Sequence, residues 1–336
     1  MSHSASVGLR DQWERWAANR PSSPITCRFR SRPIVEALES RELLSTVTEY
    51  PIPSKAGSAY QIIPGPDGNL WFTENDPVSN SIGKITPSGQ MTEFKLPTNP
   101  DFGGNPNGIV VGPDGNLWFT EQFGDRIREL TTSGQFTATY TAQSQQQLAG
   151  ITVDSAGNVW VGSVLGGHIT EITKGSSTVT TFTQPKAGWP KNLTVGPNGN
   201  VWFTDPFNTS VGQVTSSGQI TEYSLSSVSI VADPEGIVNN PVTKSLWITE
   251  QFYGYIGEIS SSGASIGQFK VPGNNPSPSS ITVDSSGNLW FSETGNDAQI
   301  GELNPTTGQF TMYNLPTGAK TAGITARLSA ATKRTD

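Results

Sequence analysis

The stretch Gly65-Pro66-Asp67-Gly68-Asn69-Leu70-Trp71-Phe72-Thr73-Glu74 combines a tight turn with a short strand, and versions of it recur along the chain. The tryptophan marks six units at steps of 42 to 47 residues, at Trp71, Trp118, Trp160, Trp202, Trp247 and Trp290. A repeat of about 40–45 residues is the length of one four-stranded propeller blade. The repeat therefore predicts an all-β chain folded as a β-propeller.

The second unit shows the pattern expected of one blade. Short strands are predicted at 108–111, 117–121, 127–130 and 136–140, and Asp114-Gly115 supplies the tight turn between the first two. A lone four-stranded sheet cannot bury both of its faces, whereas a ring of such sheets can. The repeated tryptophan is accordingly expected to pack between neighbouring blades and not to bind a ligand.

Both ends of the repeat region contain further pieces of a blade. Residues 46–53 resemble an outer strand, and residues 322–325 resemble an inner strand. We therefore expect six complete blades plus an incomplete seventh built from both chain ends, the propeller extending over residues 46–326. The alternative is that six blades close the ring and the two pieces attach at the seam.

Charge and composition narrow the function classes. A net charge of −7 argues against nucleic acid as a partner, because phosphate binding needs a basic surface. No apolar run is long enough to span a membrane. Cys27 is the single cysteine, so no disulfide can form within the chain. We expect a monomer.

Residues 1–45 form an N-terminal tail outside the repeats, and residues 327–336 form a C-terminal one. Within the first, residues 34–45 read Ile-Val-Glu-Ala-Leu-Glu-Ser-Arg-Glu-Leu-Leu-Ser, which suits a short amphipathic helix. This segment also resembles the E-x-L-E-x-R-x-L-L-S leader near the start of many exported bacterial proteins. That resemblance predicts export to the periplasm or the cell exterior, and an ordinary solvated helix is the alternative.

The repeat unit has a more specific resemblance. The opening stretch is followed by Ile82-Gly83-Lys84-Ile85 and then by Thr92-Glu93-Phe94, a series that resembles the streptogramin lyase (virginiamycin B lyase) family over residues 46–326. The resemblance implies a seven-bladed propeller. It also implies opening of cyclic depsipeptide antibiotics by elimination, with a histidine base and a magnesium ion held by glutamates.

The family's active residues are not found at the matching positions. Its Glu-Pro-His-Gly-Ile motif in the seventh blade corresponds to Lys320, Thr321, Ala322, Gly323 and Ile324 here, and its sixth-blade histidine corresponds to Ser279. The chain has only two histidines, His3 in the tail and His168, which is expected on the surface. These replacements favour a binding or interaction protein without catalytic activity, or a decayed member of the family.

Blade 5 offers an alternative. Asp233 and Glu250 match the two metal carboxylates of the family motif shifted by two blades, and Glu235 stands in the position of the base. Oxygen ligands of this kind suit Mg²⁺ or Ca²⁺. A divergent carbon–oxygen lyase using Glu235 as base is therefore the second hypothesis, and an acidic rim without a metal is the simpler interpretation. The sequence leaves catalysis open.

The position of the base recurs in every unit and predicts a ring of residues around the central opening. Its mixed polar character would suit a small polar molecule or a peptide. Aromatic residues at Trp189, Phe252 and Tyr253 would add apolar surface nearby. The carboxylates that end the second strands are expected to be structural, because they are repeated; they are Glu74, Glu121, Asp205, Glu250 and Glu293. The ring consists of Tyr60, Asn107, Ala149, Lys191, Glu235, Ser279 and Ala322.

Overall fold

The computed structural model describes residues 49–54, 58–76, 78–97, 104–143, 146–225, 233–294, 299–315 and 323–325. The predicted tails, 1–45 and 327–336, lie outside these residues, as do Lys320 and Ala322. Every regular element in the described ranges is a β-strand, which confirms the all-β prediction.

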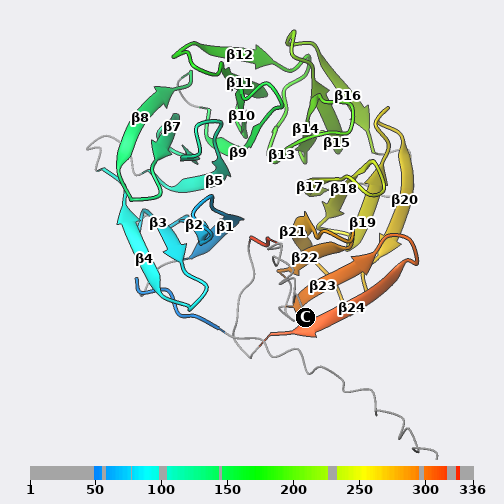
Figure 1. Cartoon of the computed structure of the whole chain (residues 1–336). Coiled ribbons are helices and arrows are strands. Elements are labelled where there is room, and N and C mark those ends of the chain that lie inside the picture. The colour runs from blue at the N-terminus through cyan, green and yellow to red at the C-terminus, as the bar shows by residue number, and fades with distance from the viewer. Residues whose placement is uncertain are drawn as a thin grey trace, which may run out of the picture. The chain divides into compact units, whose positions relative to one another are not determined.

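The strands form six antiparallel sheets of four strands each, in chain order from the centre outward (Figure 1). Blades 1 to 3 contain β1 (Ala59–Pro64), β2 (Leu70–Glu74), β3 (Ser81–Ile85) and β4 (Met91–Lys95); β5 (Pro106–Val111), β6 (Leu117–Glu121), β7 (Arg126–Leu130) and β8 (Phe136–Thr141); and β9 (Leu148–Val153), β10 (Val159–Ser163), β11 (His168–Ile172) and β12 (Val179–Thr183). Blades 4 to 6 contain β13 (Leu193–Val195), β14 (Val201–Asp205), β15 (Ser210–Val214) and β16 (Ile220–Ser224); β17 (Pro234–Asn240), β18 (Ser245–Glu250), β19 (Tyr255–Ile259) and β20 (Ser265–Lys270); and β21 (Pro278–Val283), β22 (Leu289–Glu293), β23 (Gln299–Asn304) and β24 (Gln309–Asn314).

The turn in the repeated motif has two roles, seen clearly in blade 2. Gly115 adopts a φ of 80°, and its N–H donates to the Gly112 carbonyl over 3.1 Å, which closes the turn between β5 and β6. Asp114 Oδ1 then accepts the Asn116 N–H and the Trp118 indole N–H, both over 3.1 Å. The aspartate that makes the tight turn thus also fixes the orientation of the tryptophan.

The repeated tryptophans pack against the next blade, as predicted. Trp71 in β2 lies in one buried cluster with Ile109, Leu117 and Phe119 of blade 2. Trp118, Trp160, Trp202 and Trp247 make the equivalent contact with the blades that follow them. Burial of these large apolar side chains is the main interaction between blades.

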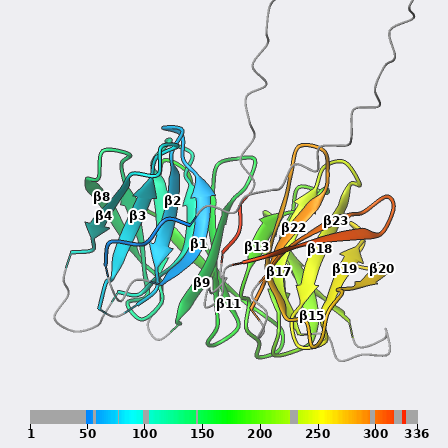
Figure 2. The same cartoon turned by 90° about the horizontal axis from the view of Figure 1, so that it is seen from below.

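Trp290 in blade 6 is the exception. It stacks on Tyr313 of its own blade with ring centroids 5.5 Å apart, but it is only half-buried. Figure 2 shows the reason: beyond blade 6 the ring has a seam, with β23 on one side, β1 on the other and a short segment, 323–325, between them. The structure assigns no strand to 323–325 or to 49–54, so the predicted seventh blade is not confirmed. The described residues contain six blades, not the seven that the family resemblance implied, because no seventh turn-and-tryptophan motif follows Trp290.

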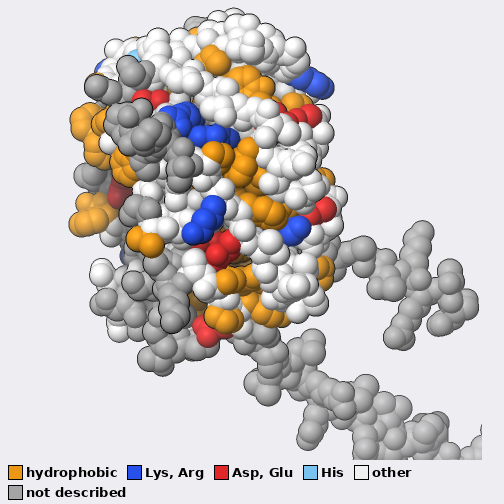
Figure 3. Space-filling view, turned by 90° about the vertical axis from the view of Figure 1, so that its left-hand side faces the viewer, with side chains coloured by type: hydrophobic (Ala, Val, Ile, Leu, Met, Phe, Trp, Pro, Cys, Tyr) orange, Lys and Arg blue, Asp and Glu red, His pale blue; other side chains and the backbone are white. Residues whose placement is uncertain are grey.

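On the outer wall over β4 and β8, charged side chains are mixed with hydrophobic and polar ones (Figure 3). Basic and acidic side chains lie singly or in small groups among hydrophobic and polar ones. The part of the chain that the structure describes also contains no helix with the length and apolarity needed to cross a bilayer.

Candidate functional site

The predicted ring residues that the structure describes lie at one end of the central channel, which we call the mouth. Tyr60, Asn107, Glu235 and Ser279 are each the second residue of an inner strand, and Lys191 lies two residues before β13. Tyr60, Glu235 and Ser279 line a single cavity of about 240 Å³ together with Gln61, Asn192 and Thr294. The structure therefore brings together residues that are more than 200 positions apart in the sequence, as the repeat predicted.

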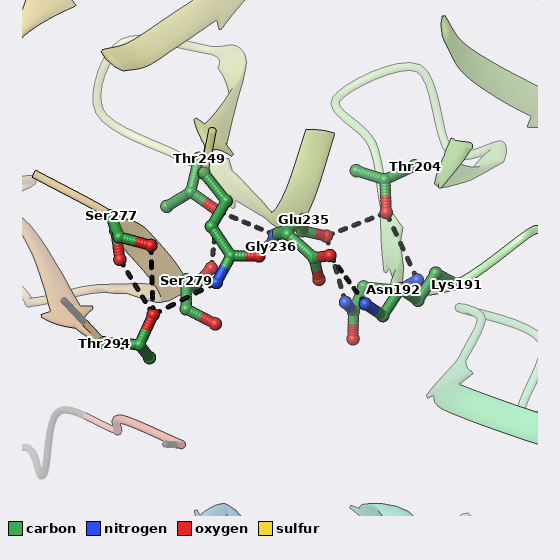
Figure 4. Close-up of polar contacts among 10 residues, drawn as sticks. Lys191, Asn192, Thr204, Glu235, Gly236, Thr249, Ser277, Ser279 and Thr294 are labelled. Atoms are coloured by element: carbon green, nitrogen blue, oxygen red, sulfur yellow. Dashed lines mark hydrogen bonds and ion pairs between the residues drawn. The ribbon is translucent and has the colours of Figure 1, made fainter. Parts of the chain in front are cut away.

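An ion pair dominates the electrostatics of the mouth. Lys191 Nζ lies 2.6 Å from Glu235 Oε1, and the side chains are 28% and 13% exposed (Figure 4). Burial raises the pKa of Glu235, and the Lys191 ammonium only partly offsets this effect. Burial disfavours the charged form of Lys191, yet the attraction of Glu235, Tyr60 and Asp233 outweighs it and raises the pKa of Lys191. The geometry is that of an ion pair, in which burial disfavours the charge of Glu235 while the attraction of Glu235 favours the charge of Lys191.

Tyr60 faces this pair from blade 1. Its side chain is 38% exposed, and burial raises the pKa of Tyr60 despite the nearby Lys191 ammonium, which acts in the opposite direction. Asn107, which is buried, forms a hydrogen bond with Tyr60. The mouth thus presents one accessible aromatic ring beside one paired cation and anion.

In four blades a threonine hydroxyl on the second strand fixes the mouth residue of the next blade, and sequence reasoning missed it. Thr204 Oγ1 accepts the N–H of Asn192 in its own blade over 3.3 Å and donates to the Glu235 carbonyl of the next blade over 2.8 Å. Thr73, Thr120 and Thr249 donate in the same way to the carbonyls of Asn107, Ala149 and Ser279. The signal was present in the motif, as the threonine of the Trp-Phe-Thr-Glu stretch.

Replacing Thr204 with valine is expected to lower the free energy of unfolding by about 1–3 kcal/mol, because the Glu235 carbonyl loses a buried donor while the shape of the side chain is retained. Chemical denaturation measures the change. Thr221→Val, at an exposed position of β16, is the matched control and should alter stability by less than about 0.5 kcal/mol. Equal losses in the two variants would show that the hydroxyl of Thr204 has no special role.

The two carboxylates proposed for a metal have other contacts. Both oxygens of Glu250, which is buried, accept the Gln268 side-chain amide over 2.9 Å. Asp233 precedes β17 and acts electrostatically on Lys191 and Glu235. Across the described ranges, no group of three or more His, Cys, Asp or Glu side chains is arranged as a metal site. The carboxylate at the mouth is paired with an ammonium, so this donor set does not fit a magnesium site with a histidine base such as the family resemblance implies. The metal at blade 5 stays a prediction.

The repeated carboxylates at the ends of the second strands are all buried. Asp205 Oδ1 accepts the backbone N–H groups of Trp189 and Asn208 over 3.0 and 3.1 Å, and Glu293 Oε2 accepts that of Ser277 over 2.7 Å. These contacts are the predicted capping of backbone donors. Glu121 instead pairs with Arg128, and Glu74 accepts the Ser54 hydroxyl.

His168 begins the third strand of blade 3, where its Nδ1 lies 3.1 Å from Thr183 Oγ1 of the outer strand β12. It is therefore on the outer part of the blade and does not line the mouth cavity.

The loops around the mouth carry exposed apolar side chains. Each of these side chains lies shortly after the end of a second strand. The strand register places that end beside the start of the inner strand, as Glu250 lies beside Pro234. Phe252 is 75% exposed, and Trp189 packs on Phe207 with ring centroids 5.1 Å apart. Sequence reasoning had noted Trp189, Phe252 and Tyr253, but missed that the position repeats in other blades. The exposed members of this rim are Val78, Phe123, Leu165, Phe207 and Phe252.

A ring of four-stranded blades with a polar, partly charged mouth and an apolar rim defines a β-propeller whose candidate site is the end of its central channel. The model of the virginiamycin B lyase family matches residues 40–135 and 99–332, so the chain belongs to that family.

Solved structures support the same relationship. A streptogramin B lyase structure is 30% identical, with a TM-score of 0.75, over 82% of this chain and 89% of that chain. A catalytically inactive variant of virginiamycin B lyase from Staphylococcus aureus, with a histidine replaced by alanine and solved with quinupristin, is 29% identical with a TM-score of 0.75 over 83% of this chain and 92% of that one. Among curated proteins, virginiamycin B lyase of Saccharopolyspora erythraea is 39% identical over 57 residues, which are 17% of this chain and 18% of that protein. This match covers less than a fifth of that relative.

Proposed function

We propose that this protein binds a peptide or small polar molecule at the mouth of the propeller without catalysing a reaction on it. The observation that carries the proposal is the Lys191–Glu235 pair beside Tyr60 at the mouth of the propeller. A cation, an anion and an aromatic ring can hold a ligand by charge, hydrogen bonding and stacking, but they include no histidine to act as a base.

The size of the cavity limits what can enter it. Pockets that enclose drug-sized ligands have volumes of about 300–1,000 Å³. The mouth cavity, at about 240 Å³, suits one small polar group or one side chain of a larger ligand. The remainder of such a ligand would lie against the exposed apolar rim, where Phe207 with Trp189 and Phe252 with Tyr253 offer stacking surfaces.

A relative supports binding without turnover. The Staphylococcus aureus variant that lacks one histidine is described as catalytically inactive and was solved with quinupristin. In the present chain, Ala322 stands where the family resemblance places the histidine base, and Lys320 where it places a metal carboxylate. By analogy, a chain with alanine at this position would keep the ability to hold a ligand while losing the group that removes a proton.

The second candidate is a divergent lyase in which Glu235 acts as base. The observation in its favour is that burial raises the pKa of Glu235, as general bases near neutral pH require. Against it, Glu235 is already paired with Lys191. Glu250, which this candidate needs as a metal ligand, already accepts a hydrogen bond from Gln268. An ion-paired carboxylate is a weak base, so we place this candidate second.

Incubation with quinupristin and Mg²⁺ separates the two candidates. We expect binding, detected by calorimetry, with Tyr60→Ala weakening it at least tenfold and Ile266→Ala, on the exposed face of β20, leaving it unchanged. We expect the depsipeptide ring to stay closed. Because elimination leaves the mass unchanged, ring opening must be followed by chromatography and fragmentation. Opening that is lost in Glu235→Gln would establish the lyase instead, and an absence of binding would refute the proposal for this ligand class.

A further inference from the structure

The face of blade 1 at the seam carries an open apolar cavity of about 450 Å³. It is lined by residues of β1, β2, β3 and β4, and by Tyr50 and Ile52 from the segment that precedes β1. The equivalent faces of the other five blades are covered by the tryptophan of the preceding blade. Blade 1 has no such neighbour among the described residues.

The lining of this cavity matches, residue by residue, the cluster that surrounds Trp71 one blade further on. Tyr50 and Ile52 correspond to Phe94 and Leu96, the outer-strand pair of the blade that supplies the tryptophan. The receiving blade provides the others: Ile62, Leu70, Phe72, Ile85 and Met91 correspond to Ile109, Leu117, Phe119, Leu130 and Phe136. Of the fully buried members of the Trp71 cluster, two have no counterpart at the cavity, namely Trp71 itself and Ile82 of the third strand.

Contacts on both sides of the cavity repeat those of a complete blade. The Tyr50 ring lies over Gly89 as the Phe94 ring lies over Gly134, since a Cβ on either glycine would fall about 2 Å from the ring. At the centre of the ring, Gly323 lies against the backbone of Tyr60 and Gln61 in the way that Gly236 lies against the backbone of Ser279. The Ile324 N–H also donates to the Ser280 hydroxyl of blade 6 over 3.3 Å. The inner and outer positions of a blade are thus occupied, and no residue that the structure describes fills the two middle positions.

We propose that this seam is a docking site for a β-hairpin of another polypeptide, whose strands supply a tryptophan and, nine to eleven residues later, an aliphatic side chain. That spacing is the one between Trp71 and Ile82 and between Trp118 and Ile127, which fill the covered pockets. The hairpin would lie between Tyr50 and Gly323, and its tryptophan would stack on Tyr50 as Trp71 stacks on Phe94, where the ring centroids are 5.4 Å apart. The argument is independent of what the mouth binds.

A second copy of the chain is a poorer occupant. The tryptophans of blades 1 to 5 are buried against the next blade, and every second strand is hydrogen-bonded on both sides within its own sheet. A copy would have to release one of these hairpins from a complete blade. A separate hairpin does not have to be released from a blade. Its two strands would take the two middle positions, where a preformed surface is available for pairing.

The test uses the full chain and a labelled synthetic hairpin with the sequence of residues 112–131, which contains Trp118 and Ile127. Fluorescence anisotropy is expected to show saturable binding, and the same peptide with Trp118→Ala should bind at least tenfold more weakly. On the protein, Tyr50→Ala should weaken binding about tenfold, whereas Ile266→Ala at an exposed site should not.

Hydrogen exchange provides a readout that does not depend on variants. The peptide should slow amide exchange in the segment around Tyr50 and at the inner strand β1, and should leave blades 3 and 4 unaffected. Equal binding of the two peptides, or no binding because another part of the chain or a second copy already fills the cavity, would overturn the proposal. Sedimentation of the chain alone shows whether it forms a dimer, as it would if a second copy filled the cavity.

Discussion

Replacing Trp202 with alanine is expected to lower the free energy of unfolding by about 3–5 kcal/mol, the usual cost of truncating a buried tryptophan. The side chain is fully buried between blades 4 and 5, where it contacts Ile237, Leu246 and Ile248. Its removal leaves a large cavity that strands held in two rigid sheets cannot close. Urea denaturation followed by circular dichroism measures the loss.

Trp290→Ala is the matched control, because it removes the same side chain from the same strand position. Trp290 is only half-buried, so the loss should be about 2 kcal/mol or less. Equal losses at the two positions would contradict the inter-blade role of the tryptophans. They would instead indicate that each stabilises mainly its own blade through the stacked aromatic ring.

Replacing Lys191 with methionine should destabilise the protein by about 3 kcal/mol at pH 8. It leaves the Glu235 carboxylate buried without its partner, which costs about 3–5 kcal/mol in fully buried pairs and less here because Lys191 is 28% exposed. The double variant with Glu235→Gln removes the unpaired charge and should recover most of the loss. Failure of the double variant to recover would show that the lysine acts through packing and not through charge.

The pH dependence of this loss follows from the pKa of Glu235, which burial already raises in the folded protein. A carboxyl group whose pKa is raised on folding favours the folded state at low pH, and this contribution is lost as pH rises from about 4.3, the ordinary value, through the folded pKa. Without Lys191, the pKa rises further. The difference in stability between Lys191→Met and the parent should therefore be small near pH 4 and grow until Glu235 is ionised in both folded proteins. A constant difference from pH 4 to 8 would contradict the assignment.

Much of the fold could be predicted because one motif recurs with little change. The Asp-Gly turn and the tryptophan occupy the same place in each unit, so a single interpretation of blade 2 extended to the others. Strand bounds were close: the inner strand predicted at 108–111 begins at Pro106, because Pro106 pairs with Glu121 across an irregularity in register. Such an irregularity leaves no mark on hydrophobic alternation.

The candidate site was predicted less completely. The positions of Tyr60, Lys191, Glu235 and Ser279 followed from the repeat, but the pairing of Lys191 with Glu235 did not, because these two residues belong to adjacent blades and meet only where the inner ends of those blades lie side by side. The rim was partly missed for a similar reason. Phe123, Leu165 and Phe207 lie in loops of differing sequence, and their shared exposure follows from the strand ends that carry them.

The threonine hydroxyls have a consequence for how such a ring can change over evolution. Four mouth residues belong to one blade while their backbone is positioned by the threonine of the blade before it, as Thr204 positions Glu235. A duplication or exchange that ends between sheets would separate these mouth residues from the hydroxyls that align them. An exchange that takes the second strand of one blade together with the inner strand of the next would keep them together. Viable chimaeras of this propeller should therefore have their junctions inside a blade, in the turn between its first and second strands.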